Sequence, residues 1–211
     1  MTSRIFLLSP ARCRGPRASL LTARGSRFAL AARLRADGVP LGEVLSFLSG
    51  LYFRGKLTYA RTFAQPPAGA GDGVFVITPH LGLQAPDVVC TMATLRAAGR
   101  VDITADNRRY RQPLETTAQG LDAVIGPGTQ VVLLGSVATG KYVDVLTNMF
   151  GDRLAFPAEF VGRGDMSRGG LMLRCVAERR ELTYVTIGPT TARHGPRPAR
   201  LDPKTRPLAG V

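Results

Sequence analysis

Short apolar runs alternate along this chain with longer stretches that suit helices, and this alternation constrains the fold more than any other feature. We expect buried strands at Ile5–Leu8, Val74–Thr78, Val101–Thr104, Val131–Leu134, Leu154–Phe156 and Thr183–Ile187. We expect helices near residues 18–36, 41–64, 87–98, 113–124, 139–150 and 168–180. Strands and helices in alternation predict an α/β fold, a mainly parallel, doubly wound sheet flanked by helices.

The length of 211 residues suits one well-cored domain, and we expect a single α/β domain over residues 1–188. Residues 65–73, rich in Pro, Gly and Ala, form a flexible connection inside it. Residues 189–211 hold five prolines and five cationic side chains, which predicts a basic, proline-rich and poorly ordered tail.

The formal net charge of +13 is concentrated at the two ends of the chain. Residues 1–61 carry 11 Lys and Arg against 2 Asp and Glu, residues 62–187 carry 12 of each sign, and residues 188–211 carry 5 against 1. A neutral middle with basic ends favours a polyanionic partner such as nucleic acid. A coding sequence rich in G and C also enriches arginine, and this remains the alternative explanation.

The cysteines Cys13, Cys90 and Cys175 are odd in number, far apart and without C-x-x-C spacing. This pattern argues against a disulfide framework and a zinc site and favours a cytoplasmic location. The sequence assigns no metal and no cofactor, and it leaves the binding of iron or another metal open. No apolar run approaches the roughly 20 residues of a membrane span, so we expect no membrane partner. The arginine-rich residues 1–36 imitate a transit peptide, although Ile5–Leu8 fits a buried first strand better.

A segment rich in glycine and arginine, Phe160–Gly170, stands where an expected strand gives way to an expected helix. Glycines admit close approach of a ligand to the backbone, and the first N–H groups of a helix point outward. Within it we expect an anion site formed by Arg163, Gly164, Ser167 and Arg168. The alternative is a tight turn with two solvated arginines.

Polar residues also follow three other expected strands, and ligands of open α/β sheets bind at the carboxyl ends of strands. We therefore expect four loops to converge on one crevice. Besides the glycine–arginine segment, the predicted phosphate-binding residues in these loops are Ser9, Arg12, Arg14, Arg17, Ser136, Lys141 and Tyr142.

The run Gly135–Tyr142 has the glycines and lysine of a phosphate loop, G-x-x-x-x-G-K, between a strand and a helix. Tyr142 stands where that loop needs a Ser or Thr to hold magnesium. We therefore expect Lys141 to contact phosphate without nucleotide hydrolysis.

Three residues are candidates for catalysis, each with a structural alternative. Cys13 lies between Arg12 and Arg14, whose charges would lower its pKa, or it is an ordinary loop cysteine. His80 is a candidate general base, or a hydrogen-bonding structural residue. Asp87 would activate water or a leaving group, or it caps a helix.

Aromatic and cationic residues also mix in Ser49–Tyr59, where Arg54 and Lys56 would touch phosphates and Tyr52 would stack on a base. Aromatic residues at this spacing equally suit the buried face of an amphipathic helix.

Five blocks in order resemble the YaaA family of peroxide-stress proteins. Leu7–Arg12 resembles the family's opening ISPAK with arginine for lysine, Phe53–Gly55 its FKG, Leu81–Asp87 its YGLLRPLD, Ser136–Tyr142 its LASNEY, and Arg163–Arg168 its ARGLMAR. The chain departs from the family in its shorter length, in Phe156–Glu159 and in its tail. A weaker likeness links Ser9–Arg17 to the lyase-bearing domain of archaeosine synthase, although the Lys-Pro-Tyr core is absent.

The YaaA resemblance implies a cytoplasmic α/β protein that binds DNA and helps cells to tolerate peroxide. Our first hypothesis is therefore a nucleic-acid-binding protein of oxidative or DNA-damage stress, with DNA ahead of RNA as partner. The second is an enzyme acting on a nucleobase or nucleotide, a glycosidic-bond or base-modifying enzyme that holds the phosphate in the crevice. A nucleotide or another phosphate-bearing small molecule would then be the ligand.

Overall fold

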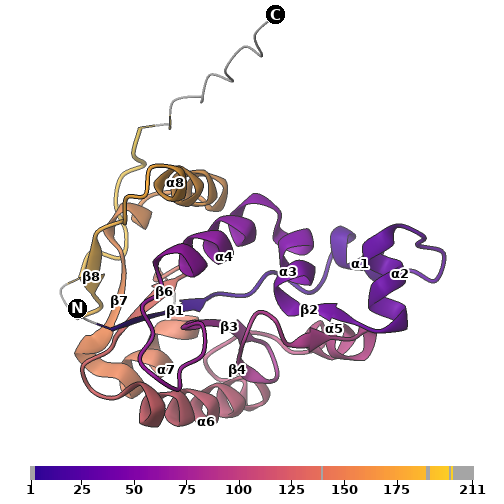
Figure 1. The fold of residues 1–211 in the computed structure, drawn as a ribbon, viewed down its shortest axis with the longest axis horizontal. Coiled ribbons are helices and arrows are strands. Elements are labelled where there is room, and N and C mark those ends of the chain that lie inside the picture. The colour runs from indigo at the N-terminus through magenta and orange to yellow at the C-terminus, as the bar shows by residue number, and fades with distance from the viewer. Residues whose placement is uncertain (1–2, 139, 189–190, 200, 202–211) are drawn as a thin grey trace, which may run out of the picture.

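The computed structural model describes residues 3–138, 140–188, 191–199 and 201, and shows one domain around a six-stranded sheet (Figure 1). The sheet order is β4-β3-β1-β6-β7-β8. Its four central strands run parallel: β3 (Val74–Thr78), β1 (Arg4–Leu8), β6 (Gln130–Leu134) and β7 (Leu154–Pro157). At the edges, β4 (Gly82–Gln84) and β8 (Tyr184–Thr186) pair antiparallel to β3 and β7. The predicted mainly parallel, doubly wound α/β sheet is confirmed.

Helices cover both faces of the sheet. One face carries α4 (Leu51–Phe63) and α8 (Asp165–Ala177), and the same core continues beyond the strands into α1 (Pro16–Thr22), α2 (Ala29–Ala36) and α3 (Leu41–Ser49). The other face carries α6 (Arg108–Ile125) and α7 (Gly140–Phe150). In β1, Phe6 and Leu8 enter the first core while Ile5 and Leu7 enter the second. Burial on both faces explains why this strand is apolar from Ile5 to Leu8.

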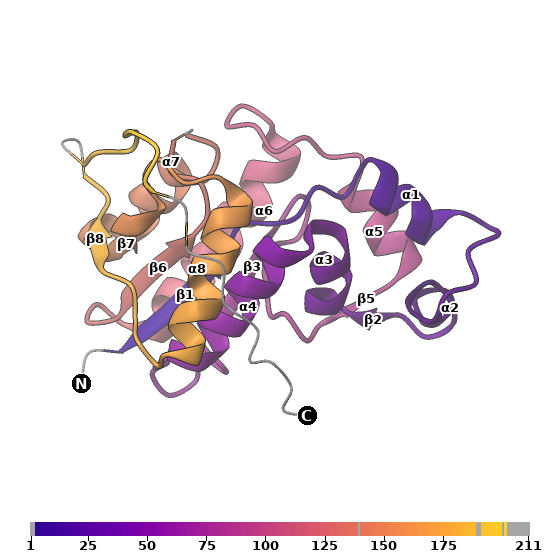
Figure 2. The same cartoon turned by 90° about the horizontal axis from the view of Figure 1, so that it is seen from above.

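A small helical lobe extends beyond the carboxyl ends of the strands (Figures 1 and 2). It contains α1, α2, α3 and α5 (Met92–Ala98). A two-stranded ladder of β2 (Val39–Pro40) and β5 (Val89–Cys90) joins its two chain segments. The lobe therefore lies next to the edge of the sheet at which α/β proteins bind their ligands.

Several expected helices are shorter or divided. The helix predicted near 18–36 is two helices, separated by a turn that contains Gly25. Gly50, at φ 59°, divides the helix predicted near 41–64, because this left-handed conformation suits glycine and stops a right-handed helix. The helix predicted near 87–98 begins only at Met92, where the hydroxyl of Thr91 accepts a hydrogen bond from Thr94 N at 3.2 Å. Asp87 is therefore not its cap.

The strand predicted at Val101–Thr104 is wrong, since this segment is irregular. Its apolar residues suit a strand, but the antiparallel β4 already pairs with the outer edge of β3. Both edges of β1 are also occupied, by β3 and β6. The segment therefore pairs with neither β3 nor β1 and lies as an irregular stretch outside the sheet.

The predicted poorly ordered tail is partly described, as residues 191–199 and 201. This part has no helix or strand but lies against the start of α8, where Arg163 Nη1 donates to Ala199 O at 3.4 Å. Leu201 packs on the core beneath it. Residues 202–211 of the expected tail lie outside the described part of the chain.

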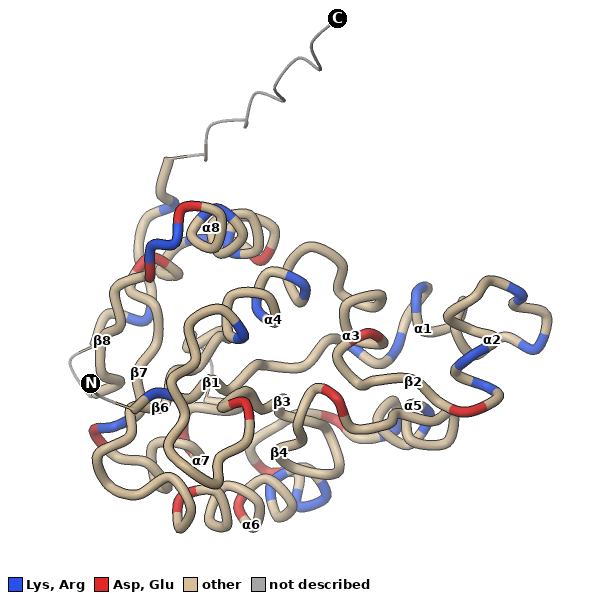
Figure 3. Tube along the Cα trace, in the orientation of Figure 1, with Lys and Arg blue, Asp and Glu red and all other residues tan. Residues whose placement is uncertain are grey.

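Positive charges line the lobe helices α1 and α2 and also decorate α8 (Figure 3). No helix in the described part of the chain is long and apolar enough to cross a membrane.

Candidate functional site

A crevice of about 720 Å³ opens at the carboxyl ends of the parallel strands. The loop after β1 leads to helices on one face of the sheet, whereas the loop after β6 leads to α7 on the other. Adjacent strands whose connections diverge in this way leave a gap, which is the usual ligand site of doubly wound folds. The crevice is lined by Pro10–Gly15, Pro79, Ala98, Val101–Thr104, Lys141, Tyr142 and Asp165.

All four loops expected to converge contribute to this crevice. They supply Arg12 and its neighbours, Pro79, the pair Lys141 and Tyr142, and Asp165. The segment Val101–Thr104 is a fifth contributor. It was not expected in the crevice because the sequence predicted a strand there.

Two cationic side chains of the crevice have no partner among the described residues. Arg12 and Lys141 are exposed, and neither side chain makes a hydrogen bond or an ion pair with the residues that the structure describes. Arg14, by contrast, forms an ion pair with Asp102 at the rim. An unpaired guanidinium and an unpaired ammonium in one concave site provide the donors that a phosphate needs.

The start of α7 is held in place by the buried Tyr110, whose hydroxyl donates to Lys141 O at 3.0 Å. Tyr142 follows and lines the crevice with a largely buried ring. Burial first, and then the charge of Asp165, raise the pKa of the Tyr142 hydroxyl to about 12. Tyr142 is therefore a neutral aromatic wall at physiological pH.

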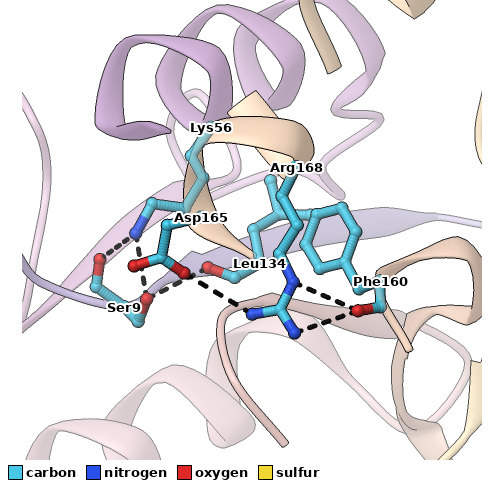
Figure 4. A network of polar contacts seen from close by, with 6 residues as sticks. All are labelled: Ser9, Lys56, Leu134, Phe160, Asp165 and Arg168. Atoms are coloured by element: carbon cyan, nitrogen blue, oxygen red, sulfur yellow. Dashed lines mark hydrogen bonds and ion pairs between the residues drawn. The ribbon is translucent and has the colours of Figure 1, made fainter. Parts of the chain in front are cut away.

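At the base of the crevice lie two neighbouring sets of polar contacts, one between Lys56 and Ser9 and one between Arg168 and Asp165 (Figure 4). Lys56 Nζ donates to Ser9 O at 2.5 Å and to Ser9 Oγ at 2.9 Å. Ser9 Oγ also lies 3.3 Å from Leu134 O, which ties the ends of β1 and β6 together. This serine is 5% exposed and its hydroxyl is engaged on both sides, so it serves as a structural link rather than an open phosphate contact.

The amine of Lys56 is fully enclosed. Its Nζ lies 4.4 Å from the centre of the Tyr52 ring and 5.1 Å from that of Phe53. Burial lowers the pKa of Lys56 to about 7, Asp165 counteracts this, and the positive charge of Arg168 adds to it. The amine of Lys56 therefore titrates near neutral pH. Because it is buried, it does not reach the open crevice.

Arg168 is committed as well. Its guanidinium donates to Phe160 O at 2.9 and 3.2 Å and lies 3.7 Å from the carboxylate of Asp165. The side chain of Asp165 is 68% exposed and lines the crevice, so its ion pair with Arg168 stands at the crevice surface.

A close helix crossing brings these contacts together. A Cβ on Gly55 of α4 would meet Gly169 O of α8 at 2.7 Å, and a Cβ on Gly169 would meet Leu51 O at 2.8 Å. These two glycines let the helix backbones touch. The crossing draws Lys56 and Arg168, their neighbours in sequence, into the interior.

A second, apolar cavity of about 70 Å³, called here the apolar chamber, adjoins the crevice. Its walls come from β3, the turn to β4, α3 and α5. Its lining includes Pro10, Cys13, Leu41, Val44, Leu45, Ile77–Leu81, Gln84, Val88–Cys90, Thr94, Leu95 and Ala98. His80 therefore faces an apolar space and not the open crevice.

The catalytic candidates do not form one constellation. Asp87 is bound by Arg61 through both carboxylate oxygens, at 2.6 and 2.7 Å, and lines neither the crevice nor the chamber. His80 has a lowered pKa because of burial and the charge of Arg109, which makes it a weak base.

The predicted activation of Cys13 is wrong. Burial, followed by the proximity of Cys90, raises the pKa of the Cys13 thiol to about 12 instead of lowering it. Arg14 beside it is engaged by Asp102. The thiol is therefore protonated and a poor nucleophile.

Four other predicted phosphate contacts lie away from the crevice. Arg17 Nη1 donates to Phe47 O at 3.1 Å inside the lobe. Arg54 is exposed on α4, and Ser136 follows β6 without lining the crevice. Lys56, as shown above, is buried.

At the predicted anion site at the start of α8, Arg163 already has hydrogen-bond partners within the chain. Arg163 donates to Glu159 O at 3.1 Å and to Ser167 Oγ at 3.2 Å. Arg163, Gly164 and Ser167 line a hollow of about 350 Å³ whose opposite wall is Arg197–Ala199 and Leu201. Of this segment, only Asp165 faces the crevice.

Sequence reasoning missed Asp102, Asp165 and the aromatic cover of Lys56 by Tyr52. Asp165 lies inside the glycine–arginine segment Phe160–Gly170. The sequence therefore pointed to the right segment, but the prediction named its arginines and not its aspartate. In the described part of the chain, no group of three or more His, Cys, Asp or Glu side chains could hold a metal ion.

Comparison with protein families, curated proteins and solved structures finds no match for this chain.

Proposed function

We propose that this chain is a nucleic-acid-binding protein whose crevice holds one nucleotide unit by its phosphate. The observation that carries the proposal is the pair Arg12 and Lys141, uncommitted within the described residues and placed together in the strand-end crevice. A guanidinium and an ammonium without internal partners favour an anion from outside the chain.

The size and the setting of the crevice support a ligand larger than a bare phosphate. Its volume of about 720 Å³ lies within the range of pockets that enclose nucleotide-sized ligands. The lobe above it contributes arginines to a basic surface, and the chain as a whole carries a net charge of +13. Such a field attracts a nucleic acid and steers its approach.

The alternative hypothesis, an enzyme acting on a nucleobase or nucleotide, receives less support. A concave crevice suits it, but the chemistry needs a group poised to transfer a proton or attack a carbon. The raised pKa of Cys13 and the ion pair of Asp87 remove two of its three candidates. The resemblance to YaaA proteins adds a setting to the binding proposal, a cytoplasmic response to peroxide, with DNA as partner.

The test is a salt series with fluorescent single-stranded DNA. The variants are Arg12→Ala, Lys141→Ala and, as a control, Arg27→Ala, an exposed arginine outside the crevice. Each crevice variant should weaken binding regardless of sequence and reduce the slope of log K against log salt by about 0.7, the value for one lost phosphate contact. Arg27→Ala should reduce the affinity for DNA less than either crevice variant does.

The same series decides against the proposal in two cases. One is binding that does not weaken with salt, because phosphate contacts demand such a slope. The other is equal loss in all three variants, which would place the nucleic acid on the general basic surface and leave the crevice unoccupied.

A further inference from the structure

Three further cationic side chains stand beside the crevice, just outside its lining. They are Arg100, Arg108 and Arg109, called here the rim arginines, which precede and follow the lining segment Val101–Thr104. All three are exposed, and none of their side chains makes a hydrogen bond or an ion pair with the residues that the structure describes. Guanidinium groups without partners in the chain are available to an anion that passes the edge of the crevice.

Arg100 stands at the end of this segment that belongs to the lobe, soon after α5. Here α5 ends against the loop that follows β1, because a Cβ on Gly99 would meet Cys13 O at 2.9 Å and Arg14 Cγ at 3.7 Å. Cys13 and Arg14 both line the crevice. Arg100 therefore lies where the lobe borders the crevice.

Arg108 and Arg109 stand at the other end of the segment, where α6 begins. Asn107 N donates to Thr104 O at 3.2 Å, and Asn107 Nδ2 donates to Asp102 O at 2.6 Å, so the helix start is anchored to the crevice wall. The hydrogen bond from α6 to the start of α7, described above, holds the same turn from the side of the sheet. Figure 2 shows the loop between α5 and α6 crossing from the lobe to the body of the molecule. The rim arginines are therefore divided between the two ends of one crevice wall.

The acidic residues of the same stretch already have partners. Asp102 forms an ion pair with Arg14, and hydrogen bonds from Thr104 and from its own backbone lower the pKa of Asp106. Residues 100–109 carry three arginines against these two aspartates, and Arg14 adds a fourth cation. The wall therefore has a cationic excess at its edges.

We propose that the ligand of the crevice is an internal segment of a single-stranded nucleic acid, whose flanking phosphates lie on Arg100 at one end and on Arg108 and Arg109 at the other. This inference rests on the proposed function. Cations at both ends of one wall suit a chain that continues beyond the crevice in both directions, whereas a free nucleotide would leave the rim arginines unused. The strand is single, because a nucleotide enclosed in a crevice has left the pairing and stacking of a duplex.

The crevice and its rim together have the two elements by which proteins hold single strands. One is a cationic path for the backbone, formed by the rim arginines outside and by Arg12 and Lys141 inside. The other is an aromatic surface for a base, and the neutral ring of Tyr142 lines the crevice beside Lys141. Such a site holds the backbone of a strand with little regard to its sequence.

The test compares three ligands in a salt series. They are thymidine 3′,5′-bisphosphate, a nine-nucleotide oligothymidylate and a hairpin duplex with the same number of phosphates as the oligothymidylate. The bisphosphate fills the crevice alone, the single strand also reaches the rim, and the duplex presents phosphates without a nucleotide that can enter. The proteins are wild type, Arg12→Ala, Arg100→Ala, the rim pair Arg108→Ala/Arg109→Ala and the control pair Arg24→Ala/Arg27→Ala, two exposed arginines at the far turn of the lobe.

We expect wild type to bind the single strand more tightly than either the bisphosphate or the duplex. For the single strand, the rim pair should reduce the slope of log K against log salt by about 1.4 and Arg100→Ala by about 0.7, the values for two lost phosphate contacts and for one. Both rim variants should bind the bisphosphate as wild type does, which also shows that they are folded. Arg12→Ala should weaken the bisphosphate and the single strand alike, and the control pair should change the slope by less than the rim pair.

Three results overturn the strand path and leave the phosphate site in the crevice standing. They are equal slopes for the rim pair and the control pair, equal loss of bisphosphate and single strand in the rim variants, and a duplex that binds as tightly as the single strand. Salt-independent binding of the single strand, or an Arg12→Ala variant that binds every ligand as wild type does, would instead refute the proposed function, and the strand path with it.

Discussion

The buried amine of Lys56 makes the stability of this protein depend on pH in a window where few other groups titrate. Its pKa is lowered from an ordinary 10.5 to about 7, chiefly because burial penalises the charged form. In the unfolded chain the amine is solvated and stays protonated up to its ordinary pKa. Between pH 7 and 10.5 the unfolded state therefore binds more protons than the folded state.

The sign and size of the effect follow from this difference. Stability rises with pH wherever the unfolded state holds the extra proton, by up to about 1.4 kcal/mol per pH unit. Between pH 7.0 and 8.5 the gain from Lys56 is about 1.6 kcal/mol, less than the full slope would give because the folded amine is still half protonated at the lower limit. Cys13 and Tyr52, whose pKa values are raised to about 12 by burial, act oppositely as their unfolded forms ionise, so the window ends near pH 9.

The assay is urea unfolding at several pH values for wild type, Lys56→Met and the control Lys141→Met, an exposed lysine. The difference in unfolding free energy between wild type and Lys56→Met cancels the cysteines and tyrosines common to both proteins. Wild type should gain about 1.6 kcal/mol relative to Lys56→Met from pH 7.0 to 8.5, whereas the stability of Lys141→Met should run parallel to that of wild type. Parallel curves for wild type and Lys56→Met would refute a neutral amine beneath the crevice.

Two further predictions concern the turn that carries His80 and the thiol in the crevice wall. Gly82→Ala should lower the unfolding free energy by more than about 2 kcal/mol, because φ is 66° and the new Cβ would overlap the backbone of Pro113. The matched change Gly120→Ala, in α6 with open space around it, should raise stability by roughly 0.5–1 kcal/mol; equal effects in urea unfolding would contradict this account. Cys13 should react with iodoacetamide at neutral pH far more slowly in the native protein than in urea, because burial raises its pKa to about 12; mass spectrometry of tryptic peptides would reveal equal rates if the thiol were activated.

Much of the fold was predictable because its strongest signals are local. Strands buried on both faces of a sheet must be apolar throughout, so β1, β3, β6 and β7 were visible as short apolar runs. Their alternation with helices then implied parallel pairing and a ligand edge at their carboxyl ends. The crevice does lie there, between the loops that the polar residues had marked.

The sequence-based predictions fell short where the structure of a segment depends on other segments that pack against it. Val101–Thr104 has the composition of a strand, but β4 occupies the edge with which it would pair. Arg163 and Ser167 have the composition of an anion site, but they bond to each other and face Arg197–Ala199 and Leu201 of the same chain. Such competition between segments distant in sequence has no local signature.

The two lysines of the crevice region separate what the sequence by itself determined from what only the tertiary structure decided. The sequence determined that a cation follows β6, because the helix start that carries Lys141 stays at the sheet edge in any doubly wound arrangement. Lys56 has the same charge and a comparable polar setting in the sequence. Only the touching glycines of α4 and α8 enclose its amine and lower its pKa, because the cost of desolvation depends on atoms brought together from across the fold.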